Sequence, residues 1–231
     1  KNFLFSLMES MELFLYRRSA AIVALTHSFK SNLISRGIKE DKIAVVINGV
    51  DIYRYTPIKR DQSLAAKYSL NNHFTVGYVG THGMAHALNN VLNAASLLRD
   101  QNRIRFLLVG PGAMRESLIA EAKLRGLDNV IFIPPQPKSR MPQVWSLCDV
   151  ALIHLRDDPV FSEVIPSKIF EAMAMGLPLI VAVPKGEATA IVECHSAGLI
   201  IPPEEPKALA AVVRYLAQEP KSMASLSAAS L

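Results

Sequence analysis

From residue 73 onwards, short apolar runs alternate with segments of helical periodicity, and this alternation constrains the fold of the 231-residue chain more than any other feature. The runs are continuous and apolar, as in parallel strands that are covered on both faces. The pattern predicts an α/β fold with a doubly wound, Rossmann-like parallel sheet and right-handed crossovers. The expected strands span residues 74–79, 105–109, 130–133, 149–155, 179–182 and 198–201. The expected helices span residues 86–101, 114–126, 139–147, 166–176, 186–195 and 206–219.

Sheets of this kind bind ligands outside the carboxyl ends of their strands, where the strand order reverses. With the common order 3-2-1-4-5-6, the first and fourth strands are neighbours at that point. The loops that follow these two strands cover residues 80–86 and 156–165, so we expect them to meet at one crevice. Gly80 and Gly83 lack a Cβ and would let the backbone approach a phosphate closely. An ordinary strand-to-helix turn is the alternative.

The segment from Glu163 to Gly176 carries two carboxylates, Glu163 before the predicted helix and Glu171 inside it. Pro166 suits the first helical position, which places Ser167 and Lys168 in the first turn, where an anion is favoured. A lysine there is unfavourable beside the helix dipole alone but fits a bound anion. The alternative is an amphipathic helix that simply packs on the sheet.

Composition and motifs exclude several classes of function. The net charge of +5, from 25 basic and 20 acidic residues, is spread along the chain and does not indicate nucleic-acid binding. No apolar run reaches the length of a transmembrane helix, and the two cysteines are expected to be free thiols. A P-loop motif is absent, the glycine spacing is a poor match to a dinucleotide-binding loop, and the histidines lack metal-site spacing.

The N-terminal part shows a different pattern. We predict a helix over residues 1–19, a strand over 20–25, a helix over 29–36 capped by Thr26 or Ser28, and a strand over 42–47. Asn48 and Gly49 then turn the chain into a linker, residues 50–72, with a short helical piece at 64–68. The expected domain division is 1–49, 50–72, 73–219 and a C-terminal tail at 220–231. Because no Met begins the sequence, we expect it to be the middle of a longer chain.

Glu163 and Glu171, separated by seven residues and followed by Ala172-Met-Ala-Met-Gly-Leu-Pro178, resemble the E-x7-E signature of retaining GT-B glycosyltransferases of family 4. Leu107-Leu-Val-Gly-Pro-Gly112 and Asn48-Gly-Val-Asp51 support the resemblance. The Pro166-Ser-Lys168 variant is similar to bacterial members that build O-antigen or capsular polysaccharide. Residues 1–49 would then be the remnant of an N-terminal acceptor domain, and residues 73–219 the domain that binds the nucleotide sugar.

The resemblance implies a metal-independent transferase that uses a nucleotide sugar, most often a UDP-sugar. Glu171 would bind the ribose hydroxyls and Glu163 the donor sugar, while Lys168 and the Ser167 backbone would meet the diphosphate. The catalytic residues would be Glu163 and Lys168, and the main chain around 133–136 would meet the base. The full set of donor-binding residues would be Gly80, Thr81, His82, Gly83, Gly110, Ile133, Pro134, Pro166, Ser167, Lys168 and Glu171. Thr81 and His86 stand near places where many members have Arg and Lys, which leaves the phosphate charge mainly to Lys168.

The partners and location follow from the same resemblance. The acceptor, a glycan or lipid-linked molecule, would bind mostly in the missing domain, so we expect this fragment to bind nucleotide but to transfer sugar poorly. A UDP-sugar 2-epimerase of GT-B fold and a non-catalytic nucleotide-binding module are the alternatives. We expect a cytoplasmic protein, with the 1–19 helix as a candidate contact with the inner membrane face. Exposed apolar residues at Ile22, Val45 and Ile47 predict a homodimer of the fragment.

Overall fold

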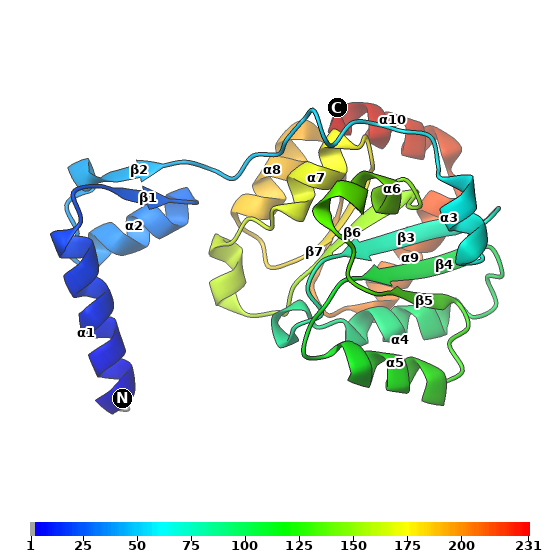
Figure 1. The fold of residues 1–231 in the computed structure, drawn as a ribbon, viewed down its shortest axis with the longest axis horizontal. Helices are drawn as coiled ribbons and strands as arrows, with labels where there is room; N and C mark the ends of the chain where they lie inside the picture. The colour runs from blue at the N-terminus through cyan, green and yellow to red at the C-terminus, as the bar shows by residue number, and fades with distance from the viewer. Residues whose placement is uncertain (1–2) are drawn as a thin grey trace.

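The computed structural model describes residues 3–231, so the first two residues of the predicted N-terminal helix lie outside it. A six-stranded parallel sheet forms the larger unit (Figure 1). Its strand order is β5-β4-β3-β6-β7-β8, which is the predicted order 3-2-1-4-5-6. The strands are β3 (Phe74–Val79), β4 (Ile104–Val109), β5 (Val130–Ile133), β6 (Val150–His154), β7 (Leu179–Ala182) and β8 (Gly198–Ile201). The predicted α/β doubly wound fold is therefore confirmed.

Helices cover both faces of this sheet, and a hydrophobic core lies on each side. One core is formed with α4 (Asn89–Leu97), α5 (Arg115–Leu124) and α9 (Pro206–Gln218). The other is formed with α3 (Gln62–Lys67), α6 (Met141–Trp145), α7 (Lys168–Ala174) and α8 (Glu187–His195). Short 3-10 turns η1 (Glu40–Lys42), η2 (Met84–His86), η3 (Lys138–Arg140) and η4 (Pro159–Glu163) punctuate the loops. Because both faces are covered, the strands are largely apolar, which explains why their bounds could be predicted closely.

Two expectations about helices in the larger unit need correction. Helix α7 begins at Lys168 rather than at Pro166, and the first helical hydrogen bond runs from Ile169 N–H to the Pro166 carbonyl. The predicted tail is helix α10 (Pro220–Ser230), which packs against α7 and α9. Its serine hydroxyls fix it to the chain after α7, since Ser227 donates to the Gly176 carbonyl. Few of its side chains are large and apolar, and Met223 and Leu226 pack against one of the two cores. The sequence of this segment therefore shows no strong helical periodicity.

The smaller N-terminal unit contains α1 (Phe3–Arg18), β1 (Ile22–Ala24), α2 (His27–Ser35) and β2 (Ile43–Val45), and a long linker joins it to the sheet (Figure 1). Thr26 caps α2 through a hydrogen bond from Phe29 N–H at 3.0 Å, as predicted. Ile22 is buried between the helices and Val45 is only half-exposed, so their expected exposure was wrong, whereas Ile47 is exposed as predicted. The neighbouring Val23 and Val46 are 61% and 56% exposed. Successive side chains of a strand point to opposite faces of its sheet, and in this two-stranded sheet the covered face is the one that packs on α1 and α2.

Helix α1 is present as predicted, but most of its apolar side chains are exposed. Leu13 and Tyr16 of this helix pack on the small core. The exposed apolar residues are Phe3, Leu4, Phe5, Leu7, Met8, Met11, Phe14 and Leu15. Among the described residues, no helix combines the length and the apolarity needed to cross a membrane.

The linker is held against the sheet by Arg60. Its guanidinium bonds to Asp149 Oδ2 at 3.2 Å, to the Leu70 carbonyl at 3.0 Å and to Thr75 Oγ1 at 2.9 Å. Asp149 in turn accepts the Thr75 N–H at 2.7 Å. Because Thr75 is the second residue of β3 and Asp149 directly precedes β6, this network joins the linker to the two central strands.

Replacing Arg60 with Met should lower the free energy of unfolding by about 1–3 kcal/mol, because several charge-assisted hydrogen bonds lose their donor. Urea denaturation followed by circular dichroism measures the change. The exposed neighbour Lys59, changed to Met, serves as the control and should shift stability by less than about 0.5 kcal/mol. Equal stability of Arg60→Met and the parent would show that the network does not hold the linker.

Candidate functional site

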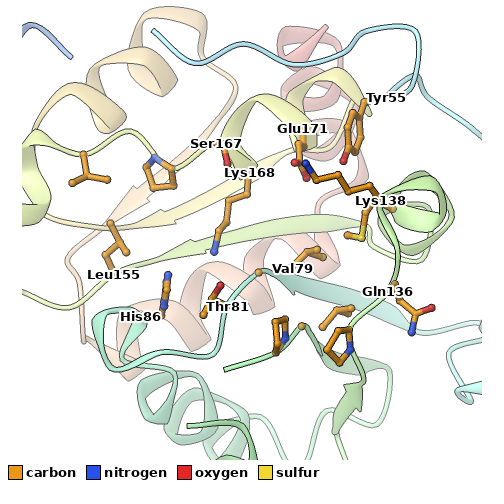
Figure 2. A pocket seen from close by; sticks show the side chains of 18 residues that line it. Tyr55, Val79, Thr81, His86, Gln136, Lys138, Leu155, Ser167, Lys168 and Glu171 are labelled. Carbon is orange, nitrogen blue, oxygen red and sulfur yellow. The ribbon is translucent and has the colours of Figure 1, made fainter. Parts of the chain in front are cut away.

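A cavity of about 530 Å³ opens at the carboxyl ends of β3 and β6, which are hydrogen-bonded neighbours. This is the predicted switch point of the sheet, and the volume suits a small-molecule ligand. The walls come from the linker, the loops after β3, β4 and β5, the end of β6 and the start of α7 (Figure 2). The lining residues are Tyr55, Val79, Gly80, Thr81, His86, Val109, Gly110, Pro111, Pro135, Gln136, Lys138, Met141, Leu155, Val164, Pro166, Ser167, Lys168 and Glu171.

Lys168 reaches into this cavity from the first position of α7 (Figure 2). Its Nζ is buried, has no hydrogen-bond partner among the described residues and lies 3.9 Å from the ring centroid of Tyr78. Burial lowers the pKa of Lys168 to about 7, and the carboxylate of Glu171 partly opposes this effect. A cation–π contact replaces only part of the lost hydration, so the ammonium can gain strongly from an anion.

Two glycines allow the backbone to come close to Lys168. A Cβ on Gly80 would lie 2.7 Å from Lys168 Nζ, and a Cβ on Gly110 would lie 2.1 Å from the Gly80 carbonyl oxygen. Both residues also have positive φ angles, +152° and +141°, which other residues rarely adopt. The loops after β3 and β4 are thus in direct backbone contact beside the ammonium.

His86 and Thr81 form the wall opposite Lys168 (Figure 2). His86 packs its ring edge against Tyr78 at 5.9 Å, and its Nδ1 is buried with no partner in the described chain. Burial, reinforced by the charge of Lys168, lowers the pKa of His86 to about 4. Two residues that line the cavity, Lys168 and His86, therefore each carry a buried nitrogen without a partner in the described chain.

Glu171 lies one turn into α7, on the side of the cavity near the linker (Figure 2). Its Oε2 accepts a hydrogen bond from the indole Nε1–H of the buried Trp145 at 3.2 Å. Tyr55 from the linker is also buried, and burial together with Glu171 raises the pKa of its hydroxyl to about 12. The tyrosine therefore stays a neutral donor beside the carboxylate, and the remaining lone pairs of Glu171 can accept from a ligand.

Some predicted residues lie elsewhere. Within the predicted base-side segment 133–136, Pro135 and Gln136 line the cavity, whereas Ile133 is buried in the core at the end of β5. The ring of His82 is fully buried behind the cavity, and burial lowers its pKa to about 4. Pro134 and Gly83 are also outside the lining. The remaining predicted residues, Gly80, Thr81, Gly110, Pro166, Ser167, Lys168 and Glu171, come together as expected.

Glu163 is also separate from this cavity. It ends η4 and lines a groove of about 600 Å³ with Glu187 and residues of α2. Glu187 bridges the two units, because its carboxylate accepts the backbone N–H groups of His27 and Ser28 at 3.1 and 2.6 Å. The two acids of the predicted pair thus line different hollows, one beside the sheet and one beside the N-terminal unit.

Sequence reasoning missed Tyr55, Trp145 and Lys138 as site residues. The linker contains Tyr53 and Tyr68 as well, so Tyr55 did not stand out, whereas a lysine after the third strand was an available signal for Lys138. Trp145 gave no signal, because a buried tryptophan in a short helix usually belongs to the core. Within residues 3–231, no three His, Cys, Asp or Glu side chains gather as a metal site would require.

Comparison with known proteins places this cavity in context. Residues 39–230 match the family described as Glycosyl transferases group 1. The D-inositol 3-phosphate glycosyltransferase of Nocardia farcinica is 32% identical over 164 residues, which cover 67% of this chain and 35% of that protein. The protein of the same name from Rhodococcus opacus is 30% identical over 220 residues, covering 91% of this chain and 48% of that one. The chain thus spans about a third to a half of these relatives.

The fold also matches solved structures. The Anabaena protein Alr3699/HepE, solved in complex with UDP and glucose, superposes with a TM-score of 0.82 at 22% identity. The match covers 96% of this chain and 60% of that one. The family match covers residues 39–230, which include every residue that lines the cavity. The chain therefore belongs to the glycosyl transferases group 1 family.

Proposed function

We propose that the cavity binds the nucleoside diphosphate of a UDP-sugar, and that the complete protein is a retaining, metal-independent glycosyltransferase of family 4 type. One observation carries the proposal: the unpartnered ammonium of Lys168 is buried at the switch point between His86 and the Gly80 backbone. An anion placed there would give each buried nitrogen a partner. The Anabaena structures with UDP and UDP-glucose support the choice of nucleotide.

The subsites follow from the lining. The diphosphate lies between Lys168, His86 and Gly80, the ribose hydroxyls donate to the carboxylate of Glu171, and the uracil lies near Gln136 and Lys138. A carboxylate accepts hydrogen bonds only, which fits a pair of ribose hydroxyls. As the sugar–phosphate bond breaks, charge grows on the diphosphate, and Lys168 stabilises that charge in a site with little water.

The sugar itself would extend towards Glu163 and the groove beside the N-terminal unit, where a glycan or lipid-linked acceptor would approach. Ser28, Ser31 and Asn32 give that groove polar side chains suited to hydroxyl groups.

We also propose a cytoplasmic location in which the exposed apolar side of α1, together with Arg17 and Arg18, contacts anionic lipid. Sedimentation with anionic vesicles tests the contact, and loss of binding in neutral vesicles is expected. Self-association through β1 and β2 is tested by size-exclusion chromatography across concentrations.

A second candidate is a nucleotide-binding module without transferase activity. It is favoured by the position of Glu163, which lines a different groove from Lys168 and Glu171. It predicts UDP binding without turnover in the full-length protein, whereas a UDP-sugar 2-epimerase would convert the sugar without any acceptor. Product analysis of the full-length protein with UDP-sugars separates these cases.

Calorimetry with UDP, GDP and ADP tests the site directly. UDP should bind most tightly, and Lys168→Met or Glu171→Ala should weaken it by about 10- to 100-fold, because each removes a charged hydrogen-bond partner. Lys185→Met changes a lysine outside the cavity and is the control. Failure of all three nucleotides to bind, or unchanged binding in both variants, would overturn the proposed function.

The affinity for UDP should fall as the pH rises above about 7. Lys168 has a pKa of about 7 in the free protein, and a bound anion raises it, so binding above this pH requires proton uptake. The fall is at most about tenfold per pH unit. Lys168→Arg stays charged and should abolish it, so an equally steep profile in that variant would contradict the assignment.

Trp145 and Tyr55 orient the carboxylate of Glu171, so the site should bind ribonucleotides more tightly than 2′-deoxyribonucleotides. The parent should prefer UDP over 2′-deoxy-UDP, and Trp145→Phe or Tyr55→Phe should reduce this preference by a few-fold, about 0.5–1.5 kcal/mol per hydrogen bond. Binding of both nucleotides by fluorescence competition measures the ratio. If both weaken equally in the variants, the two aromatic residues support the fold and not the orientation of Glu171. Tyr53→Phe, at an exposed linker position, is the control.

A further inference from the structure

His154, the last residue of β6, is a fully buried histidine that does not line the cavity. Both of its ring nitrogens have partners. Nδ1 lies 2.8 Å from the backbone carbonyl oxygen of His86, and Nε2 lies 2.8 Å from the side-chain nitrogen of Asn90. These partners stand 64 and 68 positions away in the sequence, so the imidazole joins the end of one central strand to the loop that follows the other.

The two contacts define the chemical state of the ring. A carbonyl oxygen can only accept, so Nδ1 carries the hydrogen and donates a hydrogen bond to the carbonyl of His86. The amide nitrogen of Asn90 then donates to the lone pair on Nε2. Burial lowers the pKa of His154 to about 4, which keeps the ring in this neutral form at physiological pH.

The contact with His86 fixes the wall of the cavity. The adjoining Ala85 carbonyl accepts the Arg156 N–H at 2.8 Å, so two consecutive carbonyls are tied to the chain at the end of β6. The next residue, Ala87, has a φ of +44°, a strained conformation for a residue with a Cβ, which persists only when its surroundings enforce it. The direction of the His86 side chain therefore depends on how its carbonyl is held.

We infer that His154 is a positioning residue that orients His86 towards the phosphate groups of the bound nucleotide. This inference rests on the proposed function of the cavity. The side chain of His86 lines the same cavity as Lys168, so a displacement of its backbone moves the imidazole away from the anion. The base and ribose subsites lie on other elements and do not depend on this bond.

Two amide variants separate the two bonds of His154. In His154→Asn the amide nitrogen occupies the place of Nδ1, so the donor to the His86 carbonyl is kept and the contact with Asn90 is lost. In His154→Gln the amide oxygen reaches the place of Nε2 and accepts the hydrogen bond from Asn90. The bond to the His86 carbonyl is lost. His195→Gln changes an exposed histidine on α8 and is the matched control. Circular dichroism confirms folding of each variant.

The affinity ratio of UDP to uridine, measured by calorimetry and NMR titration, is the readout. His154→Gln should lower this ratio by about tenfold, the value of one hydrogen bond, whereas His154→Asn and the control should stay within about threefold. An unchanged ratio in His154→Gln, or an equal loss of UDP and uridine affinity, would overturn the inference. Absence of UDP binding in the parent would instead reject the proposed function.

The tautomer of His154 in the parent gives an independent test that needs no variant. Long-range ¹⁵N–¹H NMR correlation spectra should show a neutral ring protonated on Nδ1 at pH 7. A proton on Nε2 would overturn the inference, because Nδ1 could not then donate to the His86 carbonyl.

Discussion

The close approach of three chain segments beside β3 is the constraint on which the site depends. Gly110 lies against the backbone of Gly80, and Gly80 leaves room for the ammonium of Lys168. A side chain at either glycine would separate the loops or displace the lysine. The parallel pairing of β3 with β4 and with β6 brings these segments to one edge, so the architecture of the sheet and the chemistry of the cavity have a common origin.

This arrangement leaves polar groups unsatisfied in the free protein. The buried nitrogens of Lys168 and His86 have no partners among the described residues, and Tyr78 offers only its ring face. Such groups reduce stability, and a ligand that satisfies them recovers that free energy on binding. By contrast, the supports behind them are fully paired: Trp145 holds Glu171, and His154 holds the His86 loop. Rigid supports under unsatisfied groups are what preorganised binding requires.

Sequence patterns that arise from burial on both faces predicted the structure closely, whereas patterns that show only an apolar face or proximity in sequence did not. Four strands of the sheet had their predicted bounds, because strands covered on both faces are continuous apolar runs. Helix α1 was predicted as a helix, yet its apolar residues are exposed, because periodicity shows that a face is apolar and not what covers it. Glu163 was placed beside Lys168 by proximity in sequence, but the loop from η4 directs it to the groove near α2.

The sequence by itself determined the α/β fold, the strand order and the meeting of Gly80, Lys168 and Glu171 at the switch point. These follow from local patterns and from the topology of parallel sheets. Only the tertiary structure decided which other side chains complete the site. Tyr55, Trp145 and His154 act through partners that are distant in the sequence. Such contacts depend on how separate elements pack, and that packing leaves no periodic trace along the chain.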